Sequence, residues 1–330
     1  MLKIQTTYGK SFSQSAGQTL LDAAAESGIS LPYSCKTGRC STCKCKVLSG
    51  RSTAKLSELG LTAEEKAQGF ILSCARSAIT DLLIDVEALG DQSIPEAKNL
   101  PSRIDSLVKL APDVLRVKLR FPPNIAFSFL AGQYIDVIGP GGIRRSYSLA
   151  NAPAAENQIH LHIRAVQNGV MSEYWFNQAK INDLIRINGP LGSFFLRPLT
   201  GLHLVFLATG TGIAPVKAML KQMANSPTDY EPLSVTVYWG GQDAQKLYAD
   251  PSQWLPSLRY VPVLSRAPVD WTGVRGHVQN ALLSDNPDLI NTVVYACGSA
   301  AMIQSAKTEL TKAGLPNNHF YCDAFVASGI

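Results

Sequence analysis

Four cysteines with a characteristic spacing restrict this chain more than any other feature of its sequence. Cys35, Cys40 and Cys43 stand in the segment CKTGRCSTC, and Cys74 follows in ILSCARS. The pattern C-x4-C-x2-C with a distant fourth cysteine is the ligand spacing of plant-type [2Fe–2S] clusters. A zinc site would favour two C-x2-C pairs, and only one such pair is present. We therefore predict that these four thiolates hold a [2Fe–2S] cluster and that the chain carries out one-electron transfer.

The other residues of this segment suit a loop that closes around a cluster. Gly38 can adopt conformations in which a β-carbon would clash. Ser41 is small, so backbone N–H groups can approach the sulfurs, hydrogen-bond to them and tune the redox potential. Cys45 lies on the expected strand Lys44–Leu48. We expect it to be a small buried side chain without a role in the cluster.

Cysteine number, charge and hydropathy limit the compartment and the function. The chain has seven cysteines, an odd number, and the N-terminal MLKIQTTYGK lacks the pattern of a signal peptide. Both observations argue against a framework of disulfides. No apolar run approaches the ~18 residues that span a bilayer. The net charge of +5 is spread along the chain and does not indicate binding of nucleic acid. We expect a cytoplasmic protein with no membrane span.

The length of 330 residues predicts two or three domains. The polar, proline-containing segment GDQSIPEAKNLP at 90–101 indicates a linker, and a weaker boundary falls near Pro198–Leu202. We predict a multi-domain chain with the following parts: an α+β, β-grasp-like domain at 1–90, a linker at 91–100, an antiparallel β-barrel at 101–200 and an α/β, Rossmann-like nucleotide domain at 201–330.

The first domain has clear helix signals on both sides of the cysteine loop. A short helix is expected over Thr19–Ser27, closed by Gly28 in a left-handed cap. Thr62 and Glu65 form the T-x-x-E pattern of a capping box. Together with the cysteine spacing, these elements make residues 1–90 resemble plant-type ferredoxins.

An extended segment of the second domain carries a cation, an aromatic ring and a hydroxyl. Arg145, Tyr147 and Ser148 stand in RSYS, and alternation along a strand places the first two on one face. Arginine pairs with phosphate through two hydrogen bonds, although such a tetrapeptide also fits an ordinary exposed strand. Further on, Ser172 is predicted to be the N-cap of the helix SEYWFNQA, and Gly169 precedes it.

The third domain alternates strands and helices and has a glycine-rich loop after its first strand. Leu204–Ala208 runs into TGTGIAP, where Pro215 suits the first turn of the helix Val216–Met223. Glycines allow the backbone to approach a diphosphate at a helix N-terminus. Cys297 ends a later strand, and Ser299 is expected to cap the helix Ala300–Lys312. Taken alone, Cys297 is better interpreted as a buried core cysteine at a strand end.

In this order, RSYS, GPLGSFF and TGTGIAP resemble the ferredoxin–NADP reductase superfamily. The whole chain resembles its iron–sulfur flavoprotein members, which implies a [2Fe–2S] cluster, FAD and NADH or NADPH as cofactors. Tyr147, Ser148 and Cys297 are then the catalytic residues. The residues that the resemblance assigns to FAD or the nucleotide are Arg145, Tyr147, Ser148, His162, Arg164, Gly169, Ser172, Gly210, Thr211, Gly212, Cys297, Gly298, Asp323 and Phe325.

The same resemblance implies electron transfer from NAD(P)H through FAD and the cluster to a partner protein. The matches GQYID, RRSYSLANAP, ACGSAAM and HFYCDAF look most like reductases that serve an iron–sulfur dehydrase in deoxysugar synthesis. Reductase components of ring-hydroxylating or diiron oxygenases are the alternative. Ser41 and Thr209 stand where this family commonly has glycine. A redox sensor or a simple electron carrier is disfavoured, because neither needs residues 101–330.

Two further expectations concern the electron donor and the acceptor. We predict a preference for NADH, because Asp243 follows the strand Val235–Trp239 and would repel a 2′-phosphate. Arg266 after the next strand is the competing feature. Basic residues surround the cluster ligands: Lys36, Arg39, Lys44 and Lys46. They either dock an acidic partner, form a solvated face or offset the negative charge of the cluster.

Overall fold

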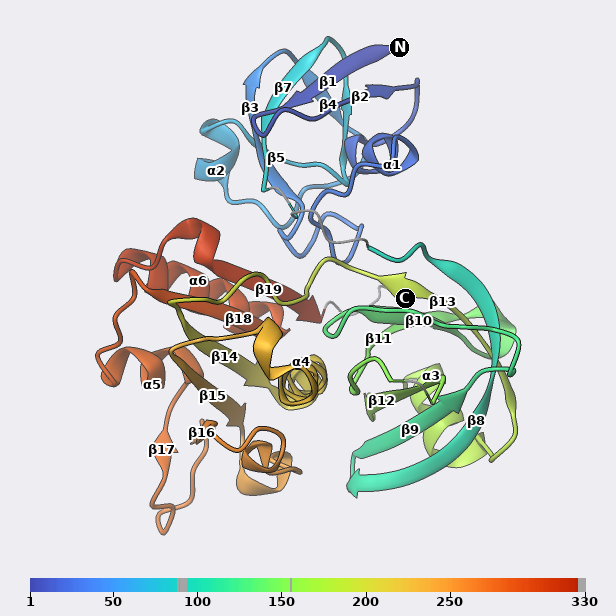
Figure 1. Ribbon diagram of the computed structural model, residues 1–330, viewed down its shortest axis with the longest axis vertical. Coiled ribbons are helices and arrows are strands. Elements are labelled where there is room, and N and C mark those ends of the chain that lie inside the picture. Colours follow the sequence, from blue (N-terminus) through green and yellow to red (C-terminus); the bar gives the residue numbers. More distant parts are fainter. Residues whose placement is uncertain (88, 90–93, 155, 326–330) are drawn as a thin grey trace. The chain divides into compact units, whose positions relative to one another are not determined.

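The computed structural model describes residues 1–87, 89, 94–154 and 156–325 (Figure 1). The chain divides into two compact units. Unit 1 comprises Met1–Ile94 with Gly192–Phe194, and unit 2 comprises Pro95–Leu191 with Phe195–Ile330. Unit 1 is an α+β fold, whereas unit 2 contains an antiparallel barrel and a parallel sheet with helices. These three folds confirm the predicted fold class. Within the described residues, no helix is long and apolar enough to cross a membrane.

Unit 1 is built on a five-stranded sheet in the order β2-β1-β7-β3-β5. Strands β1 and β7 are parallel, and the other neighbours are antiparallel. The sheet and helix α1 enclose a core that includes Ile4, Leu72 and Ile84. The elements are β1 (Leu2–Thr6), β2 (Ser11–Gln14), α1 (Leu20–Glu26), β3 (Lys44–Ser49), β5 (Phe70–Leu72) and β7 (Leu82–Asp85), with a separate pair β4 (Ser52–Ala54) and β6 (Arg76–Ala78).

The helix signals of unit 1 are confirmed. The Thr19 hydroxyl accepts a hydrogen bond from the Asp22 N–H and caps α1, and Gly28 follows the helix with φ of 71°. Thr62 and Glu65 form the complete capping box of α2 (Ala63–Ala67). Because these caps satisfy backbone groups that a helix end leaves unpaired, they fix both helices next to the cysteine loop.

The barrel of unit 2 is a six-stranded antiparallel sheet in the order β11-β10-β13-β8-β9-β12. A bridge between Leu149 and Leu161 joins its two ends and closes it. Strand β8 begins at Lys98, inside the segment that the sequence suggested as a linker, and residues 90–93 of that segment lie outside the described residues. The strands are β8 (Lys98–Ala111), β9 (Val114–Arg120), β10 (Tyr134–Ile138), β11 (Arg144–Ser148), β12 (Gln158–Arg164) and β13 (Leu184–Leu191).

The prediction that Ser172 caps a helix is wrong. Helix α3 spans Val170–Glu173, with Gly169 at its N-cap position, and continues as a π-helical turn over Tyr174–Gln178. Ser172 lies inside the first turn, and its hydroxyl accepts a hydrogen bond of 2.8 Å from the Val166 N–H. The hydroxyl therefore closes the preceding loop instead of capping the helix that follows it.

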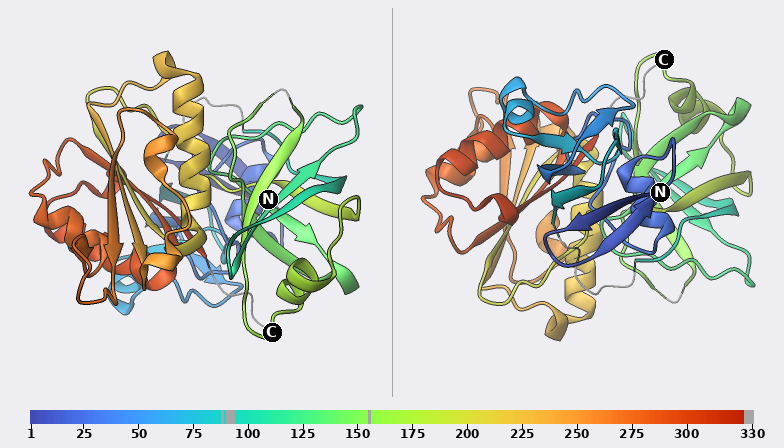
Figure 2. Two further views of the ribbon diagram at one scale, coloured as in Figure 1. Left: turned by 90° about the horizontal axis from the view of Figure 1, so that it is seen from below. Right: turned by 90° about the horizontal axis from the view of Figure 1, so that it is seen from above.

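The second fold of unit 2 is a six-stranded parallel sheet in the order β17-β16-β15-β14-β18-β19. Helix α4 covers one face, and α5 and α6 cover the other (Figure 2). The chain order reverses at β14, and such switch points are where open α/β sheets bind ligands. The elements are β14 (His203–Thr209), α4 (Ile213–Asn225), β15 (Ser234–Gly241), β16 (Arg259–Leu264), β17 (Val274–Arg275), α5 (Val278–Ser284), β18 (Thr292–Ser299), α6 (Ala300–Lys312) and β19 (Phe320–Phe325).

Candidate redox centres

The four predicted ligand cysteines come together in unit 1 as two pairs. The Cys43 thiol lies 3.1 Å from the Cys74 sulfur, and the Cys35 N–H donates to the Cys40 sulfur at 3.4 Å. In the Cys43–Cys74 pair, the Cys43 thiol donates a hydrogen bond to the Cys74 sulfur. In the Cys35–Cys40 pair, the Cys40 thiol donates one to the Cys35 sulfur. These hydrogen bonds lower the pKa of Cys74 and lower the pKa of Cys35 to about 4. In each pair, the hydrogen bond thus favours the thiolate form of the accepting cysteine.

The loop that carries these cysteines fits a [2Fe–2S] cluster. Two pairs of thiolates supply two ligands to each of two irons, whereas the described residues contain no group of three His, Cys, Asp or Glu placed around a single metal ion. The Thr37 N–H points at the Cys35 sulfur, 3.4 Å away. Backbone N–H groups turned toward one concave surface are typical of iron–sulfur sites. The cysteines and the amides of this loop therefore provide the donor set of the predicted cluster.

Two small residues hold the loop in shape. Gly38 has φ of 74°, and a β-carbon there would lie 2.2 Å from the Ser57 carbonyl oxygen, so no other residue fits without rearrangement. Ser41 has φ of 62°, a conformation that glycine adopts more readily. Its hydroxyl donates to the Gly60 carbonyl oxygen. This hydrogen bond helps to explain how serine is accepted where glycine is common.

The basic residues near the ligands are not equivalent. The Lys44 ammonium forms an ion pair of 2.5 Å with Glu65, so its charge is already balanced. Lys44 and Lys46 both lie over the Phe70 ring, so they share one face of β3. Lys36 lies 4.5 Å from the centre of the Tyr33 ring. Lys44 is consequently a weaker candidate for binding an acidic partner than the sequence alone indicated.

In unit 2, the end of barrel strand β11 meets the last strand of the parallel sheet. The Ser148 hydroxyl donates to the Asp323 carboxylate at 3.5 Å, and both residues are buried. Asp323 lies beside Cys297 in the register of β18 and β19. Burial, reinforced by the charge of Asp323, raises the pKa of Cys297 well above its ordinary value. Cys297 is therefore a neutral thiol, which suits a positioning group better than a nucleophile.

Tyr147 is held by an aromatic partner that the sequence did not reveal. The Trp175 indole N–H donates to the Tyr147 hydroxyl at 3.1 Å, and the two rings meet edge to face at 84°. Burial raises the pKa of Tyr147 to about 12, so the phenol stays neutral. Trp175 lies in the π-helical turn after α3, and the only signal for it was an aromatic run, YWF, in an expected helix. A fixed, neutral ring is suited to stack against a planar ligand.

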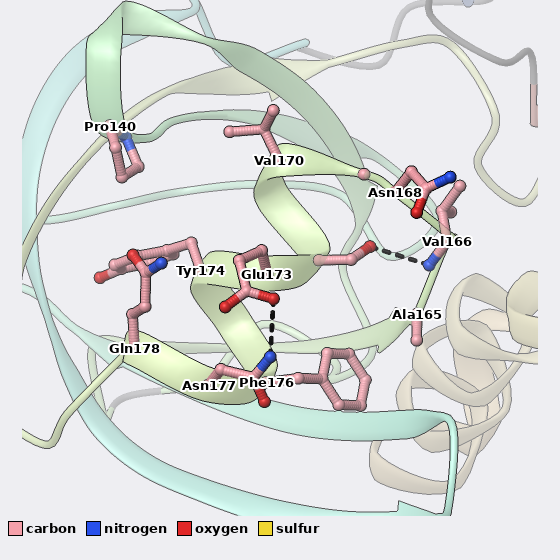
Figure 3. Close-up of a pocket in the computed structure, with 12 residues that line it drawn as sticks. Pro140, Ala165, Val166, Asn168, Val170, Glu173, Tyr174, Phe176, Asn177 and Gln178 are labelled. Atoms are coloured by element: carbon pink, nitrogen blue, oxygen red, sulfur yellow. Dashed lines mark hydrogen bonds between the residues drawn. The ribbon is translucent and has the colours of Figure 1, made fainter.

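Two residues predicted to contact FAD line a cavity of about 540 Å³ on the barrel (Figure 3). It lies between Pro140, in the turn after β10, and helix α3, where Gly169 and Ser172 contribute to its wall. On this helix the Asn177 amide donates to the Glu173 carboxylate at 2.7 Å. Arg145, on the neighbouring strand β11, donates to the Arg144 carbonyl oxygen. Arg145, Tyr147 and Ser148 do not line this cavity, and their assignment to FAD stays a prediction.

The glycines predicted to bind the nucleotide lie where two strand ends approach closely. A β-carbon at Gly212 would lie 2.2 Å from the Cys297 carbonyl oxygen. One at Gly298 would lie 2.2 Å from the Thr209 hydroxyl. That hydroxyl accepts a hydrogen bond from the Ser299 N–H, so Thr209 joins β14 to β18. The Gly210–Gly212 turn leads into α4, whose N-terminus lies at the switch point of the sheet.

His162 and Arg164, both on β12, face the parallel sheet. His162 Nδ1 and the Tyr248 hydroxyl share a hydrogen bond of 3.1 Å. Burial lowers the pKa of His162 to about 3, so the imidazole is neutral, and its Nε2 atom is buried with no hydrogen-bond partner among the described residues. Arg164 lies against the nucleotide turn, since a β-carbon at Gly210 would be 2.8 Å from its Nη1 atom. Their assignment to FAD stays a prediction.

The remaining site residues lie at or just after the carboxyl ends of strands of the parallel sheet. Phe325 ends β19, opposite Ser299, and is partly exposed. Thr211 is the middle residue of the Gly210–Gly212 turn. The Arg266 N–H donates to the Gln242 carbonyl oxygen at 2.9 Å, which brings the competing arginine next to the loop that contains Asp243. The preference for NADH stays a prediction.

Comparisons with known proteins agree with this arrangement. The chain matches the 2Fe-2S iron-sulfur cluster binding domain over residues 4–78, the oxidoreductase FAD-binding domain over 101–196 and the oxidoreductase NAD-binding domain over 206–308. It is 42% identical to the CDP-6-deoxy-L-threo-D-glycero-4-hexulose-3-dehydrase reductase of Yersinia pestis, over 96% of each chain. It is 32% identical to reductase component 1 of the terephthalate 1,2-dioxygenase of Comamonas sp., over 94% of this chain and 93% of the relative. The crystal structure of the Amycolatopsis cytochrome P450 reductase GcoB has a TM-score of 0.74 and 30% identity, covering 98% of this chain and 99% of that one.

Proposed function

Because the chain belongs to the NAD(P)H-dependent iron–sulfur flavoprotein reductases, which transfer electrons through FAD and a [2Fe–2S] cluster, we propose that its acceptor is an iron–sulfur dehydrase of deoxysugar synthesis. The protein would then act as a CDP-6-deoxy-3,4-glucoseen reductase. The observation that supports this choice is the 42% identity to such a dehydrase reductase along nearly the whole chain. The runner-up is a reductase component of a ring-hydroxylating or diiron oxygenase, supported by the 32% identity to a dioxygenase component.

A direct assay separates these acceptors. The purified reductase is mixed with NADH and one of two acceptors. The first is the CDP-6-deoxy-L-threo-D-glycero-4-hexulose-3-dehydrase of Yersinia pestis, under anaerobic conditions. The second is the terminal component of the Comamonas dioxygenase, supplied with terephthalate and O2. We expect the cluster to be reoxidised in repeated turnovers by the dehydrase and its sugar substrate. Turnover with the oxygenase component alone would instead support the runner-up.

The residue roles in unit 2 are also part of the proposal. FAD, when bound, accepts a hydride from NADH and passes single electrons to the cluster. Tyr147, fixed by Trp175, offers the neutral ring on which the flavin stacks. The Ser148 hydroxyl donates to Asp323, so its lone pairs are left to accept a hydrogen bond at the flavin edge. The backbone of Gly210–Gly212 approaches the diphosphate of the nucleotide.

Cys297 is proposed to position the nicotinamide ring for hydride transfer. We expect Cys297→Ala to slow FAD reduction at saturating NADH by about 10- to 100-fold, because small displacements of reacting atoms have effects of this size. Binding of NAD⁺ should change much less. Stopped-flow absorbance of the flavin measures the rate. Cys322→Ala is the matched control. Cys322 lies beside Ala296 in the register of β18 and β19 and has no proposed role at the nicotinamide, so the rate should be unchanged. An unchanged rate in Cys297→Ala contradicts this role.

The cluster loop is proposed to be the docking face for an acidic acceptor. We expect Arg39→Glu to slow electron delivery to the dehydrase several-fold, because charge complementarity mainly raises the rate of encounter. Lys10→Glu, in the turn between β1 and β2, makes the same change in net charge and serves as the control. Reduction of FAD by NADH should be normal in both. A delivery rate that responds neither to Arg39→Glu nor to salt would leave the basic residues as a solvated face.

A cytoplasmic location is the last part of the proposal. All seven cysteines are free of disulfides in the structure. Free thiols and thiolate cluster ligands persist in a reducing compartment. This supports the location that the sequence suggested.

A further inference from the structure

Three charged side chains from distant parts of unit 2 meet beside the nucleotide turn. Asp113 lies in the turn between β8 and β9, Arg164 ends β12, and Lys246 belongs to the 3₁₀ turn Ala244–Lys246 after β15. One oxygen of Asp113, Oδ2, accepts hydrogen bonds from Lys246 Nζ at 2.8 Å and from Arg164 Nε at 3.3 Å. A single carboxylate therefore holds two cations, one from the barrel and one from the parallel-sheet fold.

Both cations lie at the carboxyl ends of the central strands. A β-carbon at Gly210 would lie 2.8 Å from Arg164 Nη1, so the guanidinium lies against the glycine turn that leads into α4. A β-carbon at Gly241, the last residue of β15, would lie 3.1 Å from the Cβ atom of Lys246. The Trp239 indole N–H donates to the Gly210 carbonyl oxygen at 3.0 Å and fixes the turn beneath them.

Like a phosphate oxygen, the Asp113 carboxylate is a negatively charged hydrogen-bond acceptor for arginine and lysine. Burial raises the pKa of Asp113, but the hydrogen bonds from Lys246 and Arg164 outweigh burial, so the pKa lies below its ordinary value and the carboxylate is ionised. The three side chains remain 28%, 28% and 39% exposed, so an incoming anion can reach them. Two cations against one carboxylate leave an excess positive charge, and a nucleotide diphosphate carries two negative charges that arginine and lysine bind well.

We propose that Asp113 is an internal competitor for the nicotinamide nucleotide. In the free protein its carboxylate holds Arg164 and Lys246, and when the nucleotide binds, the diphosphate takes these two cations from it. Asp113 thereby weakens nucleotide binding and favours release of the oxidised nucleotide after hydride transfer. This inference rests on the proposed nucleotide site at Gly210–Gly212. The opposing view is that the three charges only join the barrel to the parallel sheet, in which case removing Asp113 would loosen the site.

The test measures binding of NAD⁺ and of ADP-ribose to the FAD-loaded protein by titration calorimetry, without turnover. Asp113→Asn keeps the size of the side chain and removes its charge. We expect this variant to bind both ligands about 3- to 10-fold more tightly, the size expected when two partly exposed ion pairs no longer compete. Lys246→Met should weaken binding by a similar factor. In the double variant the gain from Asp113→Asn should shrink, because the two residues act on each other.

Asp105→Asn is the matched control. Asp105 also lies on the barrel and pairs with two cations, Lys118 at 3.6 Å and Arg120 at 3.5 Å, so the variant makes the same change in net charge. Its affinity should equal that of the wild type. Affinity that is unchanged or weaker in Asp113→Asn would overturn the competitor role.

Gly210→Ala separates that failure from a failure of the nucleotide site itself. Its β-carbon would intrude on the proposed site at a residue with φ of 55°, so weaker binding of both ligands is expected. Wild-type affinity in Gly210→Ala would overturn the site. The bound FAD spectrum and the melting temperature show that each variant is folded.

Discussion

Cys74→Ser is expected to lose the [2Fe–2S] cluster and to keep FAD. The Cys74 and Cys43 sulfurs lie 3.1 Å apart and form one of the two ligand pairs. A serine hydroxyl is not readily ionised and binds iron less well than a thiolate, so one iron would lose half of its protein ligands. All residues proposed to bind FAD belong to unit 2, and they are unaffected by the substitution.

Iron content, the electron paramagnetic resonance signal of the reduced protein and the FAD-to-protein ratio measure this result. We expect iron to fall to a small fraction of two atoms per chain, with one FAD retained. Reduction of FAD by NADH should continue, whereas delivery of electrons to the acceptor protein should fall by at least about 100-fold.

Cys45→Ser provides the control for this prediction. Cys45 is buried in the core of unit 1, on strand β3, and belongs to neither sulfur pair. Its replacement should lower the stability of the unit because a hydroxyl is buried, while the cluster spectrum remains. Retention of the full cluster spectrum in Cys74→Ser would show that the ligand assignment is wrong.

Arg145→Ala is expected to release FAD. The Arg145 guanidinium is on the same strand as Tyr147 and is proposed to pair with the flavin diphosphate. Loss of one partner of a hydrogen-bonded charge pair costs roughly 2–5 kcal/mol, which weakens binding by at least about 30-fold. The cluster in unit 1 should be retained, so the purified variant would be coloured by iron and sulfur alone.

Gel filtration followed by measurement of the FAD-to-protein ratio checks this result, and flavin fluorescence gives the Kd. Arg144→Ala is the matched control. Arg144 precedes Arg145 in β11 and, by alternation, lies on the opposite face of the strand. It should retain FAD. Full occupancy of Arg145→Ala after gel filtration would contradict the proposed flavin site.

Local sequence patterns determined much of this protein. The cysteine spacing identified the four residues that meet as two sulfur pairs, because three of them lie on one short loop. Capping residues predicted the ends of α1 and α2, since a cap acts within three or four residues of the groups it satisfies. The glycine-rich motif singled out Gly210 and Gly212, and the resemblance singled out Gly298. At Gly212 and Gly298 the structure shows strand ends too close for a β-carbon, whereas at Gly210 the Arg164 guanidinium takes that space.

Other features depended on contacts between residues far apart in the chain. Ser172 carries the side chain of a good N-cap, yet its hydroxyl bonds to Val166, because the path of the preceding loop brings that N–H within reach. Lys44 looked like a free cation until α2 placed Glu65 beside it. In both cases the side-chain type predicted the kind of partner, but the tertiary packing determined which residue is the partner.

The sequence by itself therefore determined the cofactors, the fold class and the residues whose chemistry lies within one motif. The tertiary structure alone decided which motifs meet: Ser148 with Asp323, Tyr147 with Trp175, and Asp113 with Lys246, which are 133 residues apart. The sequence around one residue of such a pair contains no pattern that predicts the other residue. Their meeting follows from strand register and from the packing of the barrel against the parallel sheet, and both are set by the burial of apolar surface over the whole unit.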